Sequence, residues 1–216
     1  MPVFLLDKNN YNFPDGELAH ESGLLALGGD LSAKRLLNAY SKGIFPWYNE
    51  GEIIKWWCPK ERFLIFPSDI KISKSMKKVI KRNEFEITFN NDFKNVIHSC
   101  RKMREFKEGT WITDYMEEAY NNLFKLGYCI STEVYKDGVL CGGLYGVSIG
   151  KCFFGESMFS KTDNASKAAL IFLADELRKK NYVFIDCQFY TEHLESMGGV
   201  YVSWNEYKKM LKYCME

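Results

Sequence analysis

The 216-residue sequence has little of what identifies several common protein classes. Its three histidines are far apart and its seven cysteines contain no Cys-x-x-Cys pair, so neither a metal site nor a closed disulfide framework is indicated. No apolar run approaches the roughly 18 residues of a membrane span. The 29 basic and 28 acidic residues give a formal net charge of only +1, so the overall charge does not indicate a polyanionic partner. We expect a cytoplasmic protein with reduced thiols.

The composition is that of a folded protein, because 46% of the residues are hydrophobic and 16% are aromatic. Glycine and proline interrupt residues 1–62, which read as irregular except for a helix predicted from Ser32 to Gly43. Periodicity is clearer from residue 63 onward. The sequence therefore indicates two regions that meet near residue 62.

The second region predicts a mixture of helices and strands. Helices are expected near 73–82, 90–104, 113–126 and 165–180, with another opening at Thr191. Strands are expected near 63 and over 130–135, 139–149, 152–159, 183–189 and 200–202. A Ser203-x-x-Glu206 capping box predicts a last helix. This order predicts an α+β fold with a mixed, mostly antiparallel sheet.

Two polar residues stand out in the strand predicted over 183–189. Side chains two apart on a strand share a face, so Asp186 and Gln188 are expected to point the same way and Cys187 the other. A solvated edge strand would explain the pair equally well if it stood alone.

A second carboxylate, Glu156, interrupts the apolar run Phe153 to Phe159. A buried carboxylate needs a partner, because its desolvation costs several kcal/mol. That partner could be a lysine in a structural ion pair. Strands on either side of a long helix are often neighbours, so Glu156 could also lie beside Asp186 in a site with perturbed pKa values.

Aromatic residues occur in loops that contain glycine or proline, where Trp47 follows Ile44-Phe45-Pro46 and Trp111 follows Gly109-Thr110. Such rings are more often hydrophobic plugs, but they can also stack on a base. The predicted helix 73–82 is basic, with Lys74, Lys78 and Lys81 on one face. A solvated face is the simpler reading, and contact with phosphates is the other.

Six motifs in order resemble the leucyl/phenylalanyl-tRNA–protein transferases: 23–32 (GLLALGGDLS), 43–47 (GIFPW), 109–112 (GTWI), 155–160 (GESMFS), 165–167 (ASK) and 185–188 (IDCQ). The resemblance implies a small α+β domain over 1–62, packed on a domain over 63–216 related to GNAT-type acetyltransferases. It also implies an aminoacyltransferase that moves leucine or phenylalanine, with methionine as a third candidate donor. The donor would be an aminoacyl-tRNA, and the acceptor a protein with N-terminal Arg or Lys that becomes a target for degradation.

The resemblance further implies residue roles, without a cofactor or metal and in a monomer. The catalytic residues would be Asp186, Gln188 and Glu156. The tRNA 3′ end and the aminoacyl group would be held by Trp47, Trp111, Tyr40, Tyr120, Ser157, Met158 and Leu170. The acceptor stem would be gripped by Lys74, Lys78, Lys81 and Arg82.

Other functions are less well supported by the residues. An acyl-CoA-dependent N-acyltransferase on the same fold would need a glycine-rich turn before the long helix, but residues 160–164 contain no glycine. An RNA-binding module without catalysis would leave Glu156, Asp186 and Gln188 unexplained. A nucleophilic Cys187 with His193 as its base is a weaker alternative, because Cys187 is expected to face away from Asp186.

Overall fold

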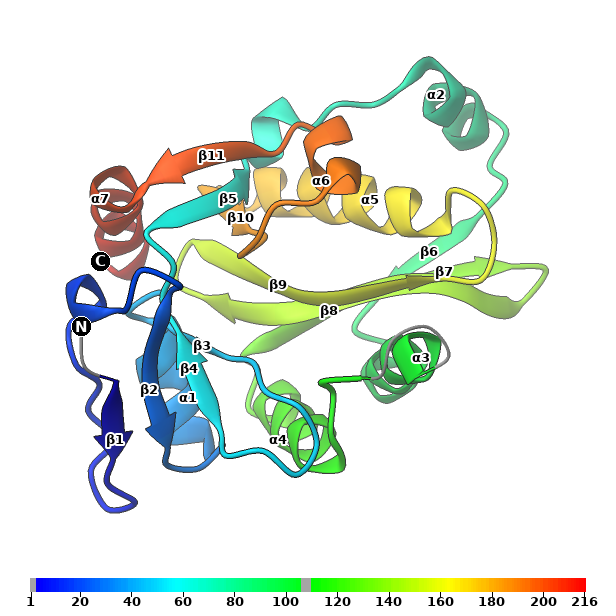
Figure 1. The fold of residues 1–216 in the computed structure, drawn as a ribbon. Coiled ribbons are helices and arrows are strands. Elements are labelled where there is room, and N and C mark those ends of the chain that lie inside the picture. The colour runs from blue at the N-terminus through cyan, green and yellow to red at the C-terminus, as the bar shows by residue number, and fades with distance from the viewer. Residues whose placement is uncertain (1–2, 106–109) are drawn as a thin grey trace.

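The computed structural model describes residues 3–105 and 110–216, which form two sheets with helices packed around them (Figure 1). Within these two stretches no helix is long and apolar enough to cross a membrane. All seven cysteines are free thiols.

The first sheet is built from short strands in the order β1-β2-β4-β3. They are β1 (Phe4–Leu6), β2 (Leu24–Gly28), β3 (Phe45–Pro46) and β4 (Lys55–Trp57). The reading of this region as irregular was therefore wrong. Strands of two to five residues are too short to show alternation, and their partners lie far apart in sequence.

Helix α1 (Ala33–Tyr40) lies in the same region and was predicted correctly. Its N-terminus is capped by Ser32, whose hydroxyl accepts a hydrogen bond from the backbone N–H of Arg35 at 3.4 Å. Gly43 follows the helix with φ 71°, a conformation that favours glycine. Because α1 ends at Tyr40, that side chain is carried into the core between the two sheets.

The second sheet has the strand order β11-β5-β10-β9-β8-β7-β6. Its strands are β5 (Glu61–Ile65), β6 (Glu86–Phe89), β7 (Cys129–Lys136), β8 (Val139–Ile149), β9 (Cys152–Ser160), β10 (Phe184–Asp186) and β11 (Val200–Ser203). Only β9 and β10 pair in parallel, so the expected mixed, mostly antiparallel sheet is confirmed. Strand β6 was not expected, because its four residues lie between two predicted helices.

Helices cover both faces of this sheet (Figure 1). They are α2 (Lys74–Lys81), α3 (Phe93–Glu105), α4 (Asp114–Lys125), α5 (Ala165–Lys179), α6 (Glu192–Ser196) and α7 (Trp204–Met215). Consecutive strand residues enter opposite cores: Phe153 packs with α5, whereas Phe154 packs with α3 and the N-terminal sheet. The predicted capping box at Ser203 and Glu206 is present at the start of α7.

Strands β9 and β10 stay paired only over Cys152–Phe154 and Phe184–Asp186. Beyond this point β9 continues beside β8, after a register shift between Tyr145 and Gly146, while β10 has ended. The expected strand over 183–189 is thus too long. Gln188 has φ 66°, which is incompatible with an extended strand. Asp186 and Gln188 do not share a strand face, and the sheet opens where they lie.

Candidate active site

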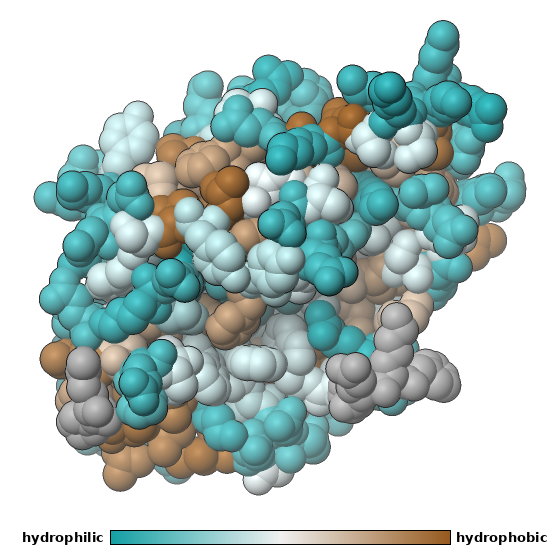
Figure 2. Space-filling view, turned by 45° about the horizontal axis from the view of Figure 1, so that its top comes forward, coloured by the Kyte–Doolittle hydropathy of each residue, from teal (hydrophilic) through white to brown (hydrophobic). Residues whose placement is uncertain are grey.

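A cavity of about 680 Å³ occupies the opening between β9 and the chain that follows β10. Its walls come from both regions of the sequence. They include Pro46, Trp47, Arg104, Trp111, Leu144, Tyr145, Phe153, Gly155, Glu156, Ser157, Met158, Leu170, Ile185, Cys187, Gln188, Phe189, Thr191, His193 and Leu194. In Figure 2, pale and brown side chains gather around a hollow in this face, and teal side chains rim it. Most of the lining is apolar, so the few polar groups define its chemistry.

Glu156 on β9 is the carboxylate of this cavity, and its side chain is 7% exposed. Oε1 accepts hydrogen bonds from the hydroxyl of Tyr40 at 2.6 Å and from Nε2 of Gln188 at 3.0 Å. Oε2 accepts one from the hydroxyl of Tyr120 at 3.0 Å. The partners are therefore three neutral donors, not the lysine of a structural ion pair.

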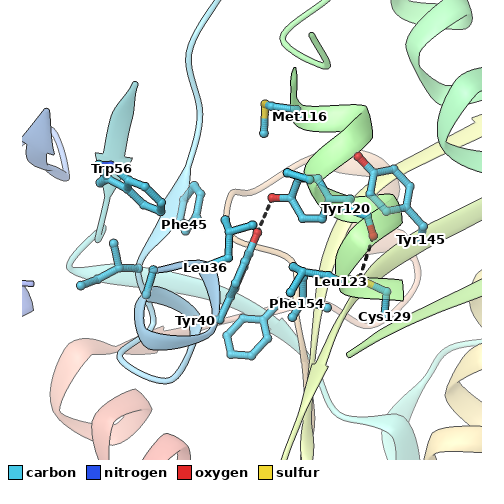
Figure 3. Packing of buried hydrophobic residues seen from close by; sticks show 14 of the residues in the cluster. Leu36, Tyr40, Phe45, Trp56, Met116, Tyr120, Leu123, Cys129, Tyr145 and Phe154 are labelled. Atoms are coloured by element: carbon cyan, nitrogen blue, oxygen red, sulfur yellow. Dashed lines mark hydrogen bonds between the residues drawn. The ribbon is translucent and has the colours of Figure 1, made fainter. Parts of the chain in front are cut away.

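Tyr40 and Tyr120 approach Glu156 from behind, on the side away from the cavity. Figure 3 shows them pointing toward one another from α1 and α4, with their hydroxyl oxygens 2.5 Å apart. Both side chains are fully buried, and neither lines the cavity. These two tyrosines connect the N-terminal region to the carboxylate.

The surroundings of Glu156 shift its pKa so that the protonated and ionised forms are both populated at neutral pH. Burial raises the pKa of Glu156 to about 7, although the hydrogen bonds from Tyr40, Tyr120 and Gln188 oppose the rise. A carboxyl group with such a pKa can accept or release a proton at neutral pH.

Asp186 is linked to Glu156 through Gln188 but has a different environment. It is completely buried, does not line the cavity, and forms an ion pair with Arg62 of β5. The hydroxyl of Tyr207 on α7 donates to Oδ2 of Asp186 at 2.7 Å. The backbone N–H of Gln188 donates to Oδ1 at 2.8 Å. Asp186 therefore holds the turn that aims Gln188 at Glu156.

Arg62 is a residue of this site that the sequence reading missed. It is fully buried, and its Nη1 also donates to the carbonyl oxygen of Gly43 at 3.1 Å. Burial lowers the pKa of Arg62, but the neighbouring Asp186 carboxylate outweighs it and the net direction is upward. The signal was available, because Arg62 interrupts the apolar strand 61–65 just as Glu156 interrupts its own.

The loop aromatics Trp47 and Trp111 both reach the cavity wall. Trp47 is 42% exposed and packs on Trp57 and Phe189, with ring centroids 5.6 Å and 5.4 Å away. Its neighbour Trp57 donates its indole N–H to the carbonyl oxygen of Trp47 at 2.7 Å. Trp47 thus presents a fixed, open ring face, which a simple hydrophobic plug would not. Gly109, in the motif before Trp111, lies outside the described residues.

Ser157, Met158 and Leu170 also line the cavity, as expected from the sequence. Met158 and Leu170 belong to an apolar wall that continues through Leu144 and Ile185. Ser157 accepts a hydrogen bond from Nε of Arg104 at 3.1 Å. The cavity therefore has an apolar side and a polar side.

The expected basic cluster is on α2, away from the cavity lining. Lys74, Lys78 and Lys81 are exposed along the helix, and Arg82 forms its C-cap. Arg82 makes an exposed ion pair with Glu84 at 3.5 Å. Met76 lies on the face of α2 that is buried against the protein, so the lysines on the opposite face point into solvent.

Comparison with known proteins agrees with the motifs. The family model described as leucyl/phenylalanyl-tRNA protein transferase matches residues 64–212, and the model of its N-terminal domain matches residues 29–60. The chain belongs to the leucyl/phenylalanyl-tRNA protein transferase family. A transferase of that name from Syntrophus aciditrophicus is 54% identical over 191 residues, covering 88% of this chain and 80% of the relative. One from Flavobacterium johnsoniae is 50% identical and covers 93% and 95%.

Solved structures resemble this transferase family member in fold. FemX is 8% identical with a TM-score of 0.53, covering 79% of this chain and 66% of FemX. Acetyltransferases are also among the matches, as with an aminoglycoside acetyltransferase from a soil metagenomic sample. The match to that enzyme has 14% sequence identity and a TM-score of 0.42, and it covers 54% of this chain and 86% of the acetyltransferase chain. The expected α+β class is confirmed, whereas the division into domains at residue 62 stays a prediction.

The structure of this transferase brings Glu156, Gln188, Trp47, Trp111, Ser157, Met158 and Leu170 together around one cavity. It places Asp186, Tyr40 and Tyr120 behind that cavity. The roles expected for all of them stay predictions. The alternative nucleophile Cys187 does line the cavity, but burial raises the pKa of its thiol, which keeps it in the less reactive protonated form.

Proposed function

We propose that this chain transfers leucine or phenylalanine from aminoacyl-tRNA to the α-amino group of proteins that begin with Arg or Lys. Methionine is a third candidate donor. The product carries a new N-terminal residue and is a target for degradation. The reaction takes place in the cytoplasm, and the protein acts as a monomer.

The observation that carries this proposal is the buried Glu156 carboxylate with a pKa of about 7, in a mostly apolar cavity. Aminolysis of an ester requires a neutral amine, which a nearby carboxylate can provide by accepting the proton of an ammonium group. The amine nitrogen then bonds to the ester carbonyl carbon. The bond from that carbon to the ribose oxygen breaks, and the surplus proton of the attacking nitrogen passes to that oxygen, which leaves as the ribose hydroxyl.

Gln188 and Glu156 are the groups that face the amine in this proposal, and Asp186 acts as a positioning residue. The resemblance implied a catalytic role for Asp186 itself. Its complete burial and its bonds to Arg62, Tyr207 and the backbone of Gln188 favour an indirect role. The negative charge of Glu156 also suits an acceptor whose first side chain is basic.

The apolar wall formed by Leu144, Met158, Leu170 and Ile185 receives the leucyl or phenylalanyl side chain. Burying such a side chain contributes about 1.5–3 kcal/mol to binding. Trp47 and Trp111 hold the terminal adenosine by stacking, which contributes about 1–3 kcal/mol per base. The lysines of α2 contact the phosphates of the acceptor stem.

Transfer of radiolabelled leucine from leucyl-tRNA to a peptide that begins with Arg or Lys tests the proposal. A peptide of the same sequence that begins with Ala is the control acceptor. We expect label in the basic peptide and little in the control. Equal labelling of both would refute the acceptor specificity, and labelling of neither would refute the transfer itself.

A further inference from the structure

Arg104 is a cation at the aromatic wall of the cavity, and in the part of the chain that the structure describes its guanidinium has no carboxylate partner. It lies on the last turn of α3, is half-buried, and lines the cavity. Its guanidinium carbon is 5.8 Å from the ring centroid of Trp111. Nε donates to Ser157, which fixes the plane of the group.

The two cations nearest Arg104 on this helix, Arg101 and Lys102, are already paired with carboxylates. Arg101 pairs with Glu105, Asp114 and Glu117, and Lys102 pairs with Glu105. Over residues 3–105 and 110–216, no carboxylate oxygen lies within 4.0 Å of the Arg104 guanidinium. With Nε on Ser157 and no carboxylate partner among these residues, the guanidinium keeps its Nη1 and Nη2 donors for an anionic ligand in the cavity.

We propose that Arg104 binds the phosphodiester on the 5′ side of the terminal adenosine of the donor RNA. This inference rests on the proposed function, because it takes the adenine to lie on Trp111. The phosphate of that nucleotide is one ribose away from the base, and the Arg104 guanidinium lies over the Trp111 ring at the same wall of the cavity. The planar guanidinium fork matches two phosphate oxygens, and Nη1 and Nη2 are the edge that Ser157 leaves open.

Two competitors that differ only in the phosphate test this assignment. Adenosine and adenosine 5′-(methyl phosphate) are each used to inhibit leucine transfer from leucyl-tRNA, and the ratio of their inhibition constants is measured. In the wild type, we expect the phosphodiester to bind about tenfold to a hundredfold more tightly. Arg104→Ala removes that preference, and Arg104→Lys retains part of it because the charge stays but the fork is lost.

Lys102→Ala is the matched control, because it removes one positive charge from the same helix at a side chain that does not line the cavity. It should keep the wild-type ratio. No preference in the wild type, or a preference that survives Arg104→Ala, overturns the phosphate assignment. Because only the ratio is used, general damage to the site does not imitate the result. Transfer by the wild type in the same assay reports separately on the proposed function.

Discussion

The backbone N–H of Gln188 donates to Oδ1 of Asp186 at 2.8 Å, so the buried carboxylate fixes the residue whose side chain reaches Glu156. The two carboxylates are thus linked through one glutamine and carry different tasks. Glu156 faces the cavity with neutral donors around it. Asp186 is neutralised by Arg62 and stays out of it.

A pair of double variants separates the charge of Asp186 from its hydrogen bond. Asp186→Asn alone leaves Arg62 buried without its partner and should lower the free energy of unfolding by about 3–5 kcal/mol. Adding Arg62→Met should recover most of this stability, while the Asn oxygen can still accept from Gln188. We expect this variant to keep most of its transfer activity.

The second double variant, Arg62→Met/Asp186→Leu, should be about as stable as the first but has no oxygen to accept the hydrogen bond from the Gln188 backbone. We expect its kcat/KM for transfer to fall about 100-fold, which corresponds to about 2.7 kcal/mol in activation free energy. Denaturant unfolding and kcat/KM are the measurements. If the Asn variant were as inactive as the Leu variant, Asp186 would act through its charge and the positioning role would be wrong.

Glu156 should give the reaction its pH dependence. Its pKa of about 7 predicts that kcat/KM rises as the pH passes through 7 and the carboxyl group ionises. In Glu156→Gln the part of this rise that belongs to Glu156 should disappear, which leaves only the titration of the acceptor amine, and the rate should be low throughout. The free amine of the acceptor titrates in both proteins, so the comparison between them isolates Glu156. An unchanged profile in the variant would contradict its role as the titrating group.

The same group predicts the stability profile, with the opposite slope. The folded-state pKa of Glu156 lies above its ordinary value of 4.5. Native protein therefore binds more protons than unfolded protein between about pH 4.5 and 7, and its stability falls as the pH rises through that window. Glu156→Gln should remove this decline, which unfolding in denaturant at several pH values would measure.

Tyr40→Phe or Tyr120→Phe should move the pH profile upward. Each hydroxyl hydrogen-bonds Glu156 and lowers its pKa, so removing one leaves the carboxyl group harder to ionise. We expect a higher midpoint in kcat/KM against pH, and a loss of about 1 kcal/mol in stability. Tyr213→Phe, at a residue that is 67% exposed, is the control. A downward or absent shift would count against this account of the site.

How much the sequence could predict depended on the length of each element. The long, strongly periodic elements, such as α5 and the meander β7–β9, were predicted because each carries its own pattern. The short strands of the N-terminal sheet were missed, since pairing with distant segments and not local pattern defines them.

The site was predictable as a set of residues but not as a geometry. Glu156 was expected to lie beside Asp186, but the structure bonds it to Gln188, whose backbone N–H in turn bonds Asp186. The positive φ of Gln188 could not be read from the sequence, because a left-handed residue after a strand is imposed by tertiary contacts. Tyr207 was not foreseen for the same reason, since it reaches Asp186 from α7.

The lysines of α2 should act on the RNA and not on the chemistry. In Lys74→Ala/Lys78→Ala/Lys81→Ala, the KM for leucyl-tRNA should rise at least about tenfold and the slope of log KM against log salt should become smaller by about two to three. Transfer from a short leucylated CCA donor should not change. Lys125→Ala/Lys136→Ala/Lys209→Ala removes the same charge from other exposed positions. An equal effect of both triple variants would mean that net charge alone is responsible.

Gln188→Gly separates the backbone of this residue from its side chain. Gln188 adopts φ 66°, which costs a non-glycine residue about 1–2 kcal/mol, and glycine relieves that strain. The variant also loses the hydrogen bond from Nε2 to Glu156, which contributes about 1 kcal/mol. These effects oppose one another, so we expect the free energy of unfolding to change by less than about 1 kcal/mol while transfer falls sharply. Asp137→Gly, at φ 51° in the exposed β7–β8 turn, is the matched control that should gain stability and keep full transfer. If Gln188→Gly kept full transfer as well, the turn would be sufficient and the side-chain amide would have no part in the reaction.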